Sequence, residues 1–153
     1  MKQFLFAVCM ALVVPFASAD SKSPGIHVTV SNIKEAKGKM AWALFAAKDG
    51  FPNKRENSVQ HGFWDIEGST SAAEGGEILK AIYLIENVAD GEYALSVYQD
   101  LDLNQKMKSN WLGIPKEPVG VSLNPKVRMG PPRYDDSKFD FKGSISLDIK
   151  LHH

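Results

Sequence analysis

The sequence predicts an all-β protein, an antiparallel β-sandwich with a long, ordered loop rich in proline and glycine. Three observations support this class. Apolar residues recur at every second position in several short segments, and helical periodicity of any length is absent. Glycine and proline separate these segments. The last segment alternates strictly between apolar and polar side chains, as a strand does with one face buried. A small barrel and an irregular α+β domain are the alternatives.

The first two strands are predicted near the start of the domain. Residues 26–31 alternate between apolar and polar side chains, which is typical of a half-buried strand. Residues 40–46 follow after a glycine, and Met40, Trp42 and Leu44 would share one face. The alanines between them indicate a face that another layer approaches closely.

Three later segments complete the predicted sheets. Residues 78–85 are apolar on both faces except at Lys80, which predicts a central strand. An Asp-Gly turn precedes residues 92–100, which again alternate. Residues 145–151 show the strictest alternation in the chain, so we expect a final strand with one face in the core.

Two stretches interrupt this pattern. Residues 51–76 are polar and rich in glycine, and residues 69–77 are expected to form a flexible loop. Residues 101–138 hold most of the prolines and show no ordinary strand or helix pattern, apart from residues 119–123. The apolar and aromatic side chains in this stretch are the wrong composition for a solvated linker. We therefore expect it to cover one end or edge of the sandwich as an ordered loop.

Residues 1–19 have the features of a cleavable secretory signal peptide. Lys2 gives a positive start, residues 4–16 are apolar without charge, and small residues at 17–19 suit a signal peptidase. The apolar run is too short to span a bilayer comfortably. We expect an exported protein, periplasmic or secreted, with residues 20–153 as a single β-sandwich domain.

Cysteine content and charge exclude several classes of site and partner. The one cysteine, Cys9, lies in the signal segment, so the domain would lack disulfides, thiolate metal sites and cysteine nucleophiles. The 18 basic and 18 acidic side chains are mixed along the chain. This pattern does not predict the basic surface patch that binds nucleic acid or an anionic membrane. No membrane insertion is expected after signal cleavage.

One segment carries a calcium-like spacing of oxygen ligands. Asp100, Asp102 and Asn104 stand at every second position, as ligands do in calcium-binding loops. Lys108 then stands where an EF-hand loop has an acceptor or a water. Two interpretations stay open: a weak, degenerate calcium site, or side chains that cap backbone N–H groups at the end of a strand.

Three aromatic residues outside the predicted strands are candidates for ligand or partner binding: Trp64, Trp111 and Tyr134. Loop aromatics can stack on sugars or anchor a protein partner. The alternative is that they close the ends of a small core.

Motifs for catalysis are scarce, and no catalytic residue is assigned. The sequence lacks the nucleophile motif G-x-S-x-G and the zinc motif H-E-x-x-H. A hydrolase that uses loop carboxylates, such as Asp102 and Asp135, would need two carboxyl groups across a cleft. Sequence neighbourhood alone cannot establish that geometry.

An ordered set of motifs resembles one bacterial family. The chain carries GEYALSVYQD at residues 91–100, LGIPKEP at 112–118 and GPPRYDD at 130–136, and residues 38–52 also match the pattern. Together they are similar to the family called domain of unknown function 2141. The resemblance implies an exported, single-domain protein with a prealbumin- or transthyretin-like (Ig-like) β-sandwich, and it implies no activity.

The chain departs from this family in the calcium-like loop. Family members commonly have two glycines and a later aspartate there, whereas this chain has Leu103, Gln105 and Lys108. These departures weaken the resemblance to a cation site. We therefore expect a non-enzymatic binding module whose 101–138 loop contacts an envelope protein or a glycan. A calcium-stabilised module and a hydrolase are the alternatives.

Overall fold

The computed structural model describes residues 23–66, 70–72, 79–111, 114–126 and 129–153. The predicted signal peptide, with Cys9, lies outside these residues. The strands and helical turns are β1 (Gly25–Ile33), β2 (Lys39–Phe45), η1 (Arg55–Asn57), β3 (Gln60–Asp65), β4 (Thr70–Ala72), β5 (Leu79–Ile85), β6 (Gly91–Asp100), β7 (Val119–Val121), α1 (Tyr134–Ser137), β8 (Phe139–Phe141) and β9 (Ser144–Lys150). Within the described part of the chain, none of the helices has the length and apolar character needed to cross a membrane.

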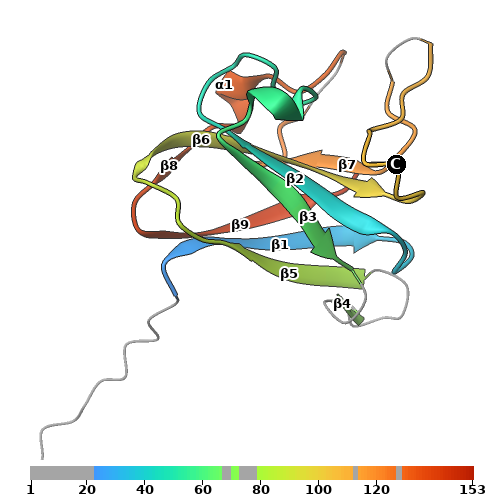
Figure 1. The fold of residues 1–153 in the computed structure, drawn as a ribbon, viewed down its shortest axis with the longest axis horizontal. Helices are drawn as coiled ribbons and strands as arrows, with labels where there is room; N and C mark the ends of the chain where they lie inside the picture. Colours follow the sequence, from blue (N-terminus) through green and yellow to red (C-terminus); the bar gives the residue numbers. More distant parts are fainter. Residues whose placement is uncertain (1–22, 67–69, 73–78, 112–113, 127–128) are drawn as a thin grey trace, which may run out of the picture.

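Two sheets pack face to face, which confirms the all-β class (Figure 1). The first sheet has the order β4-β5-β1-β9, and the second has the order β3-β2-β6-β7, with β8 also paired to β6. The side chains between the sheets form the main hydrophobic core. Figure 1 also shows η1 and α1 on the side of the second sheet that faces away from the first.

The first sheet is mixed rather than antiparallel throughout, because β1 and β9 run parallel. The chain returns to this sheet beside the start of β1, where the N–H of Gly25 donates to the carbonyl of Gly143 over 2.9 Å. A parallel pair of strands needs a long connection between them. Between β1 and β9 the chain forms all the strands of the second sheet. A side-chain period of two is the same in both directions, so the alternation in residues 26–31 and 145–151 could not show the direction.

The predicted central strand is β5, and it does lie between β4 and β1. Its apolar outer face is not covered, because Ile82 is 68% exposed. Lys80 shares this outer face and is exposed too. Part of the predicted flexible loop at 69–77 is strand β4, which pairs with β5. The remaining positions of that loop lie outside the described residues.

Strand β2, in the second sheet, is buried on both faces. Met40, Trp42 and Leu44 of β2 belong to the core between the sheets, as predicted. Ala43 on the opposite face is buried in a smaller cluster with Phe45, Ala94 and Tyr134. Loop segments and α1 form the layer that the alanines indicated.

Two elements of the second sheet relate differently to the sequence pattern. β3 was missed, because its segment is polar and rich in glycine. It pairs with β2 along its length, from Lys39 opposite Asp65 to Leu44 opposite Gln60. The strand expected within residues 119–123 is confirmed as β7, which pairs with β6.

Candidate functional site

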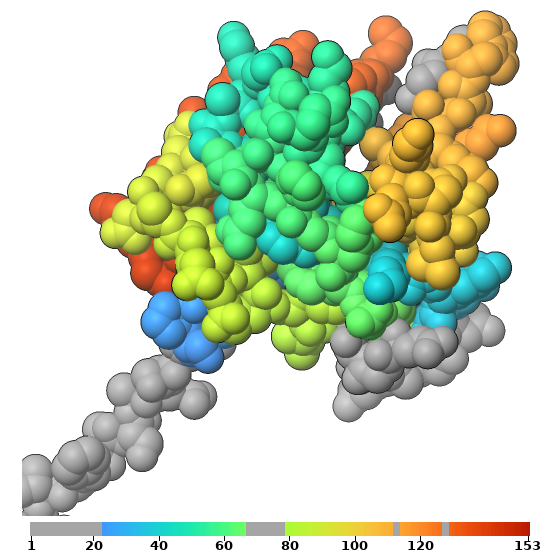
Figure 2. Space-filling view, in the orientation of Figure 1, coloured from blue at the N-terminus to red at the C-terminus, as the bar shows by residue number. Residues whose placement is uncertain are grey.

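A groove of about 540 Å³ lies on the outer face of the second sheet. One wall comes from η1 and its flanks, and the other comes from residues 105–109 and from Pro115, in the proline-rich stretch. Figure 2 shows the hollow between the segment around η1 and β3, in green, and the segment after residue 100, in amber. The lining residues are Asn53, Arg55, Glu56, His61, Tyr98, Gln105, Lys106, Met107, Ser109 and Pro115.

The second wall is a narrow, hairpin-like projection, here called the arm (residues 105–111 and 114–117). Its two sides meet at a bridge between Ser109 and Pro115. The N–H of Lys116 donates to the carbonyl of Lys108 over 2.8 Å. These bonds give the arm a fixed course beside the groove without a long strand pattern in its sequence.

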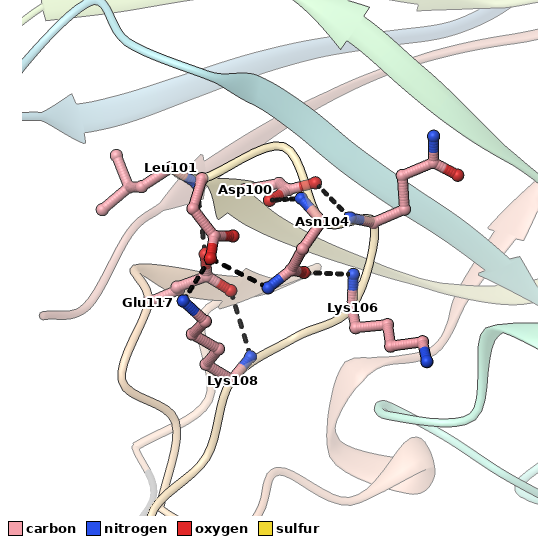
Figure 3. A network of polar contacts seen from close by, with 8 residues as sticks. Asp100, Leu101, Asn104, Lys106, Lys108 and Glu117 are labelled. Carbon is pink, nitrogen blue, oxygen red and sulfur yellow. Dashed lines mark hydrogen bonds and ion pairs between the residues drawn. The ribbon is translucent and has the colours of Figure 1, made fainter.

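Glu117 fixes the base of the arm. Its Oε1 accepts a hydrogen bond from the N–H of Leu101, and its Oε2 accepts one from the N–H of Lys108, both at 3.1 Å (Figure 3). The side chain is only 5% exposed. A buried carboxylate therefore ties the two sides of the arm to the end of β6.

Asp100 caps the loop that follows β6. Its Oδ1 accepts from the N–H of Asn104 at 3.2 Å, and its Oδ2 accepts from the N–H of Gln105 at 2.8 Å. Both Leu103 and Gln105 have positive φ, 59° and 62°. The carboxylate thus satisfies backbone donors in a tight turn, which is the capping role left open by the sequence.

Carboxylates of Asp100, Asp102 and Glu117 gather at this point, with oxygen atoms within 4.8 Å of one another. The sequence predicted the first two as ligands and missed Glu117. No spacing rule points to Glu117, because the closure of the arm brings it in. Asn104, the third predicted ligand, uses its side-chain oxygen to accept from the N–H of Lys106 over 2.8 Å.

A lysine already occupies the exposed side of this cluster. The ammonium group of Lys108 forms an ion pair with Asp102 (Figure 3). Their hydrogen bond lowers the pKa of Asp102 below its ordinary value and raises the pKa of Lys108 above its own. Both groups are therefore charged at neutral pH. The amide of Asn104 also donates to Asp102 over 3.0 Å.

The guanidinium of Arg55 lies over the ring of Phe63, 4.5 Å from its centroid. Its Nη1 atom is buried and has no hydrogen-bond partner among the described residues. The contact with the ring restrains the position of the guanidinium. The groove lining thus contains a cationic side chain that has no ion pair among the described residues.

Tyr98 stands between this cation and the acidic cluster. Burial raises the pKa of its hydroxyl, Arg55 acts in the opposite direction, and Asp100 and Glu117 add to the rise. The hydroxyl is therefore protonated at neutral pH and can donate a hydrogen bond into the groove.

The tautomer of His61 follows from its neighbour. The Ser58 hydroxyl donates to the carbonyl of Arg55 over 2.6 Å, which uses its single hydrogen. The Nδ1 of His61, 3.1 Å from the same oxygen, must then be the donor. In the neutral form of the ring, Nε2 is then the acceptor.

The three predicted aromatic binding residues lie in different environments. Trp64 belongs to β3 rather than to a loop, and it stacks on Trp42 and Tyr83 with ring centroids 5.1 and 4.3 Å apart. Tyr134 is buried in α1 and contacts Phe51 edge to face. Tyr134 is part of a small buried cluster, and Trp64 is partly buried against the main core. Trp111, in the arm, is 90% exposed.

The two carboxylates of the hydrolase alternative have separate partners. Asp102 pairs with Lys108. Asp135, in α1, has its Oδ1 atom 3.8 Å from the Nζ of Lys138, the residue that follows this helix. Lys138 also pairs with Glu92 over 3.2 Å, which raises the pKa of this lysine. The geometry does not assemble Asp102 and Asp135 into one acid–base pair.

Comparison with known proteins gives one match. Residues 28–147 match the model of a family described as "Uncharacterized protein conserved in bacteria (DUF2141)". No curated protein and no solved structure matches the chain.

Proposed function

The chain belongs to the DUF2141 family of uncharacterised bacterial proteins, and since membership brings no activity with it, we propose a function from the geometry. We propose that the protein is an exported, non-enzymatic binding module. Its ligand lies in the groove between the arm and η1. The ligand class is a small, hydroxyl-rich molecule of the glycan type.

The observation that carries this proposal is the chemistry of the groove lining. Four of its ten residues carry amide or hydroxyl groups: Asn53, Gln105, Ser109 and Tyr98. Such groups form hydrogen bonds with sugar hydroxyls in both directions. Small-molecule sites have volumes of about 300–1,000 Å³, and the groove lies within this range. An apolar ligand would leave most of these polar groups without partners.

The proposal also covers the architecture that carries the groove. We take the two sheets to be a sandwich of the prealbumin or transthyretin (Ig-like) type, with residues 101–138 as an ordered loop. The hydrogen bonds of Glu117 and the bridge in the arm support an ordered wall. Export rests on the signal-like residues 1–19, and it would bring the groove to the glycans of the bacterial envelope.

A binding role is favoured over a hydrolytic one by the state of the carboxylates. Asp100 and Glu117 are committed to backbone N–H groups, and Asp102 is paired with Lys108. Glycosidases need a protonated and an ionised carboxyl group on opposite sides of a sugar bond. The carboxylates of this cluster therefore hold the loop backbone in place.

Trp111 keeps its predicted role as a second contact. Its indole is almost fully exposed on the same arm that forms the groove wall. An exposed indole ring offers a stacking surface to a sugar. A glycan longer than the groove could then use it.

Retention of oligosaccharides by the immobilised full-length protein tests the proposal. The wild type should retain a subset of a panel of neutral and acidic envelope-type glycans. Asn53→Trp, which places a large side chain in the groove lining, should abolish retention. Lys54→Trp is the matched control, because Lys54 is exposed and absent from that lining. Absence of retention by the wild type, or unchanged retention by Asn53→Trp, would contradict the proposal.

A further inference from the structure

We infer that the ligand of this groove carries a negative charge, the carboxylate of an acidic sugar, and that Arg55 binds it. The inference rests on the proposed function and names the ligand class more narrowly. It begins from the guanidinium of Arg55, which lines the groove and has no ion pair among the described residues.

Arg55 can bind an anion because it lines the groove and its side chain is restrained by Phe63. A partly buried guanidinium without an ion pair gains free energy when an anion binds beside it. The ion pairs of the described residues involve Lys39, Lys108 and Lys138, and none of them involves Arg55. The contact with the Phe63 ring restrains the position of the guanidinium. A carboxylate in the groove can then accept hydrogen bonds from the part of the guanidinium that lines it.

Lys106 adds a second positive charge from the opposite wall. Its backbone N–H donates to Asn104, while its side chain is exposed at the groove. Among the described residues of the lining, Glu56 is the one that is acidic. One arginine and one lysine against one glutamate leave a single positive charge, which matches a monoanion.

The acidic cluster next to Tyr98 does not cancel this charge. Lys108 neutralises Asp102, and the carboxylates of Asp100 and Glu117 receive backbone hydrogen bonds. The charged groups therefore form two sets. Arg55, Lys106 and Glu56 line the groove, and the carboxylates of the acidic cluster lie at the base of the arm. An anionic group would lie at the Arg55 end, and the sugar hydroxyls would face Tyr98, Gln105 and Asn53.

A matched pair of ligands tests the inference on the unmodified protein. Calorimetric titration would compare oligomers of galacturonic, glucuronic and mannuronic acid with their methyl esters, which have nearly the same shape without the charge. At least one acid should bind about tenfold more tightly than its ester, as expected for a charge-assisted pair. This preference should weaken as the salt concentration rises.

Variants assign the effect to the named residues. Arg55→Gln should remove the preference for the acid over its ester, and Lys106→Gln should reduce it. Lys116→Gln is the matched control, because Lys116 is an exposed lysine of the same arm outside the groove lining. If Arg55→Gln unfolds, the comparison of acid with ester in the wild type still decides the matter.

The outcomes separate this inference from the proposed function. Equal affinity for acids and esters would overturn the inference and leave a neutral-glycan module standing. Failure of every sugar to bind would overturn both. Inorganic phosphate serves as a further probe, and we expect it to bind far more weakly than the acidic sugar. Equal binding of phosphate would show a general anion site and would also overturn the inference.

Discussion

The rings of Trp64 and Tyr83 lie nearly parallel, with 6° between their planes and 4.3 Å between their centroids. Trp64 belongs to β3 in the second sheet and Tyr83 to β5 in the first, so the pair joins the two sheets. Trp42 stacks on Trp64 as well, at 18° and 5.1 Å. This three-ring stack contributes to the core between the sheets.

Loss of the central ring should therefore cost stability. Trp64→Ala should lower the free energy of unfolding by about 3 kcal/mol, since it removes a large packed aromatic side chain. Trp111→Ala is the natural control, because its ring is 90% exposed and the change should stay within about 0.5 kcal/mol. Denaturant unfolding of both variants measures the difference. Equal costs would show that the stack does not stabilise the core.

Tyr83 should make the protein less stable in strong alkali. Burial, with a smaller effect of Asp65, raises the pKa of Tyr83 from 10.0 to about 12. Above pH 10 the unfolded chain loses this proton more readily than the folded protein. The contribution of Tyr83 is therefore complete below pH 10 and is lost as the pH rises through 12.

Denaturant unfolding between pH 9 and pH 12 would measure this decline. Tyr83→Phe keeps the ring and removes the titrating hydroxyl, which donates to the carbonyl of Asp65 over 3.4 Å. The variant should show a shallower decline over the same range. A decline as steep as that of the wild type would exclude Tyr83 as its source.

The hydroxyl of Ser122 connects β6 with the end of α1. It accepts from the N–H of Leu95 at 2.9 Å and donates to the carbonyl of Ser137 at 2.5 Å, in a fully buried position. Ser122→Ala would leave both backbone groups without this partner, at a cost of about 1–3 kcal/mol. Ser96→Ala removes a hydrogen bond to Pro52 in a half-buried position, and should cost less. The reverse order in denaturant unfolding would argue against a connecting role for Ser122.

The sequence predicted those strands whose inner faces carry regular apolar side chains, such as β1 and β9. It could not reveal β3, because one of its inward positions is Gly62. A Cβ atom there would lie 3.1 Å from the indole of Trp42, so the ring of the neighbouring strand fills the space that a side chain would occupy. A glycine whose place in the core is taken by a side chain of the next strand adds no apolar residue to the sequence pattern.

The candidate site divides in the same way. Asp100 and Asp102 were found because ligand spacing is local in the sequence. Glu117 and Arg55 were not, since the closure of the arm and the position of η1 depend on tertiary structure. Trp64 and Tyr134 were predicted as loop aromatics because their neighbours are polar, although both pack into clusters formed by distant residues.

Lys108 should make the acidic cluster insensitive to calcium. Its ammonium already pairs with Asp102, on the exposed side where a cation would approach. A true site would add about 2.7 kcal/mol at a calcium concentration one hundredfold above its dissociation constant. We expect the same melting temperature with millimolar calcium and with EDTA, and a calcium-dependent rise in the wild type would contradict this role of Lys108.

Substitution of Lys108 should lower the stability at neutral pH, and this effect should become smaller in acid. Lys108→Gln should lower the melting temperature at pH 7, because the three carboxylates would then face one another without a cation. The ion pair holds the pKa of Asp102 below 3.8, so its contribution is present above that pH and is lost as the pH falls through the lowered value. The difference from the wild type should therefore shrink toward pH 3, while Lys116→Gln should match the wild type at both values. A difference that persists unchanged at pH 3 would show that Lys108 stabilises the arm through packing rather than charge.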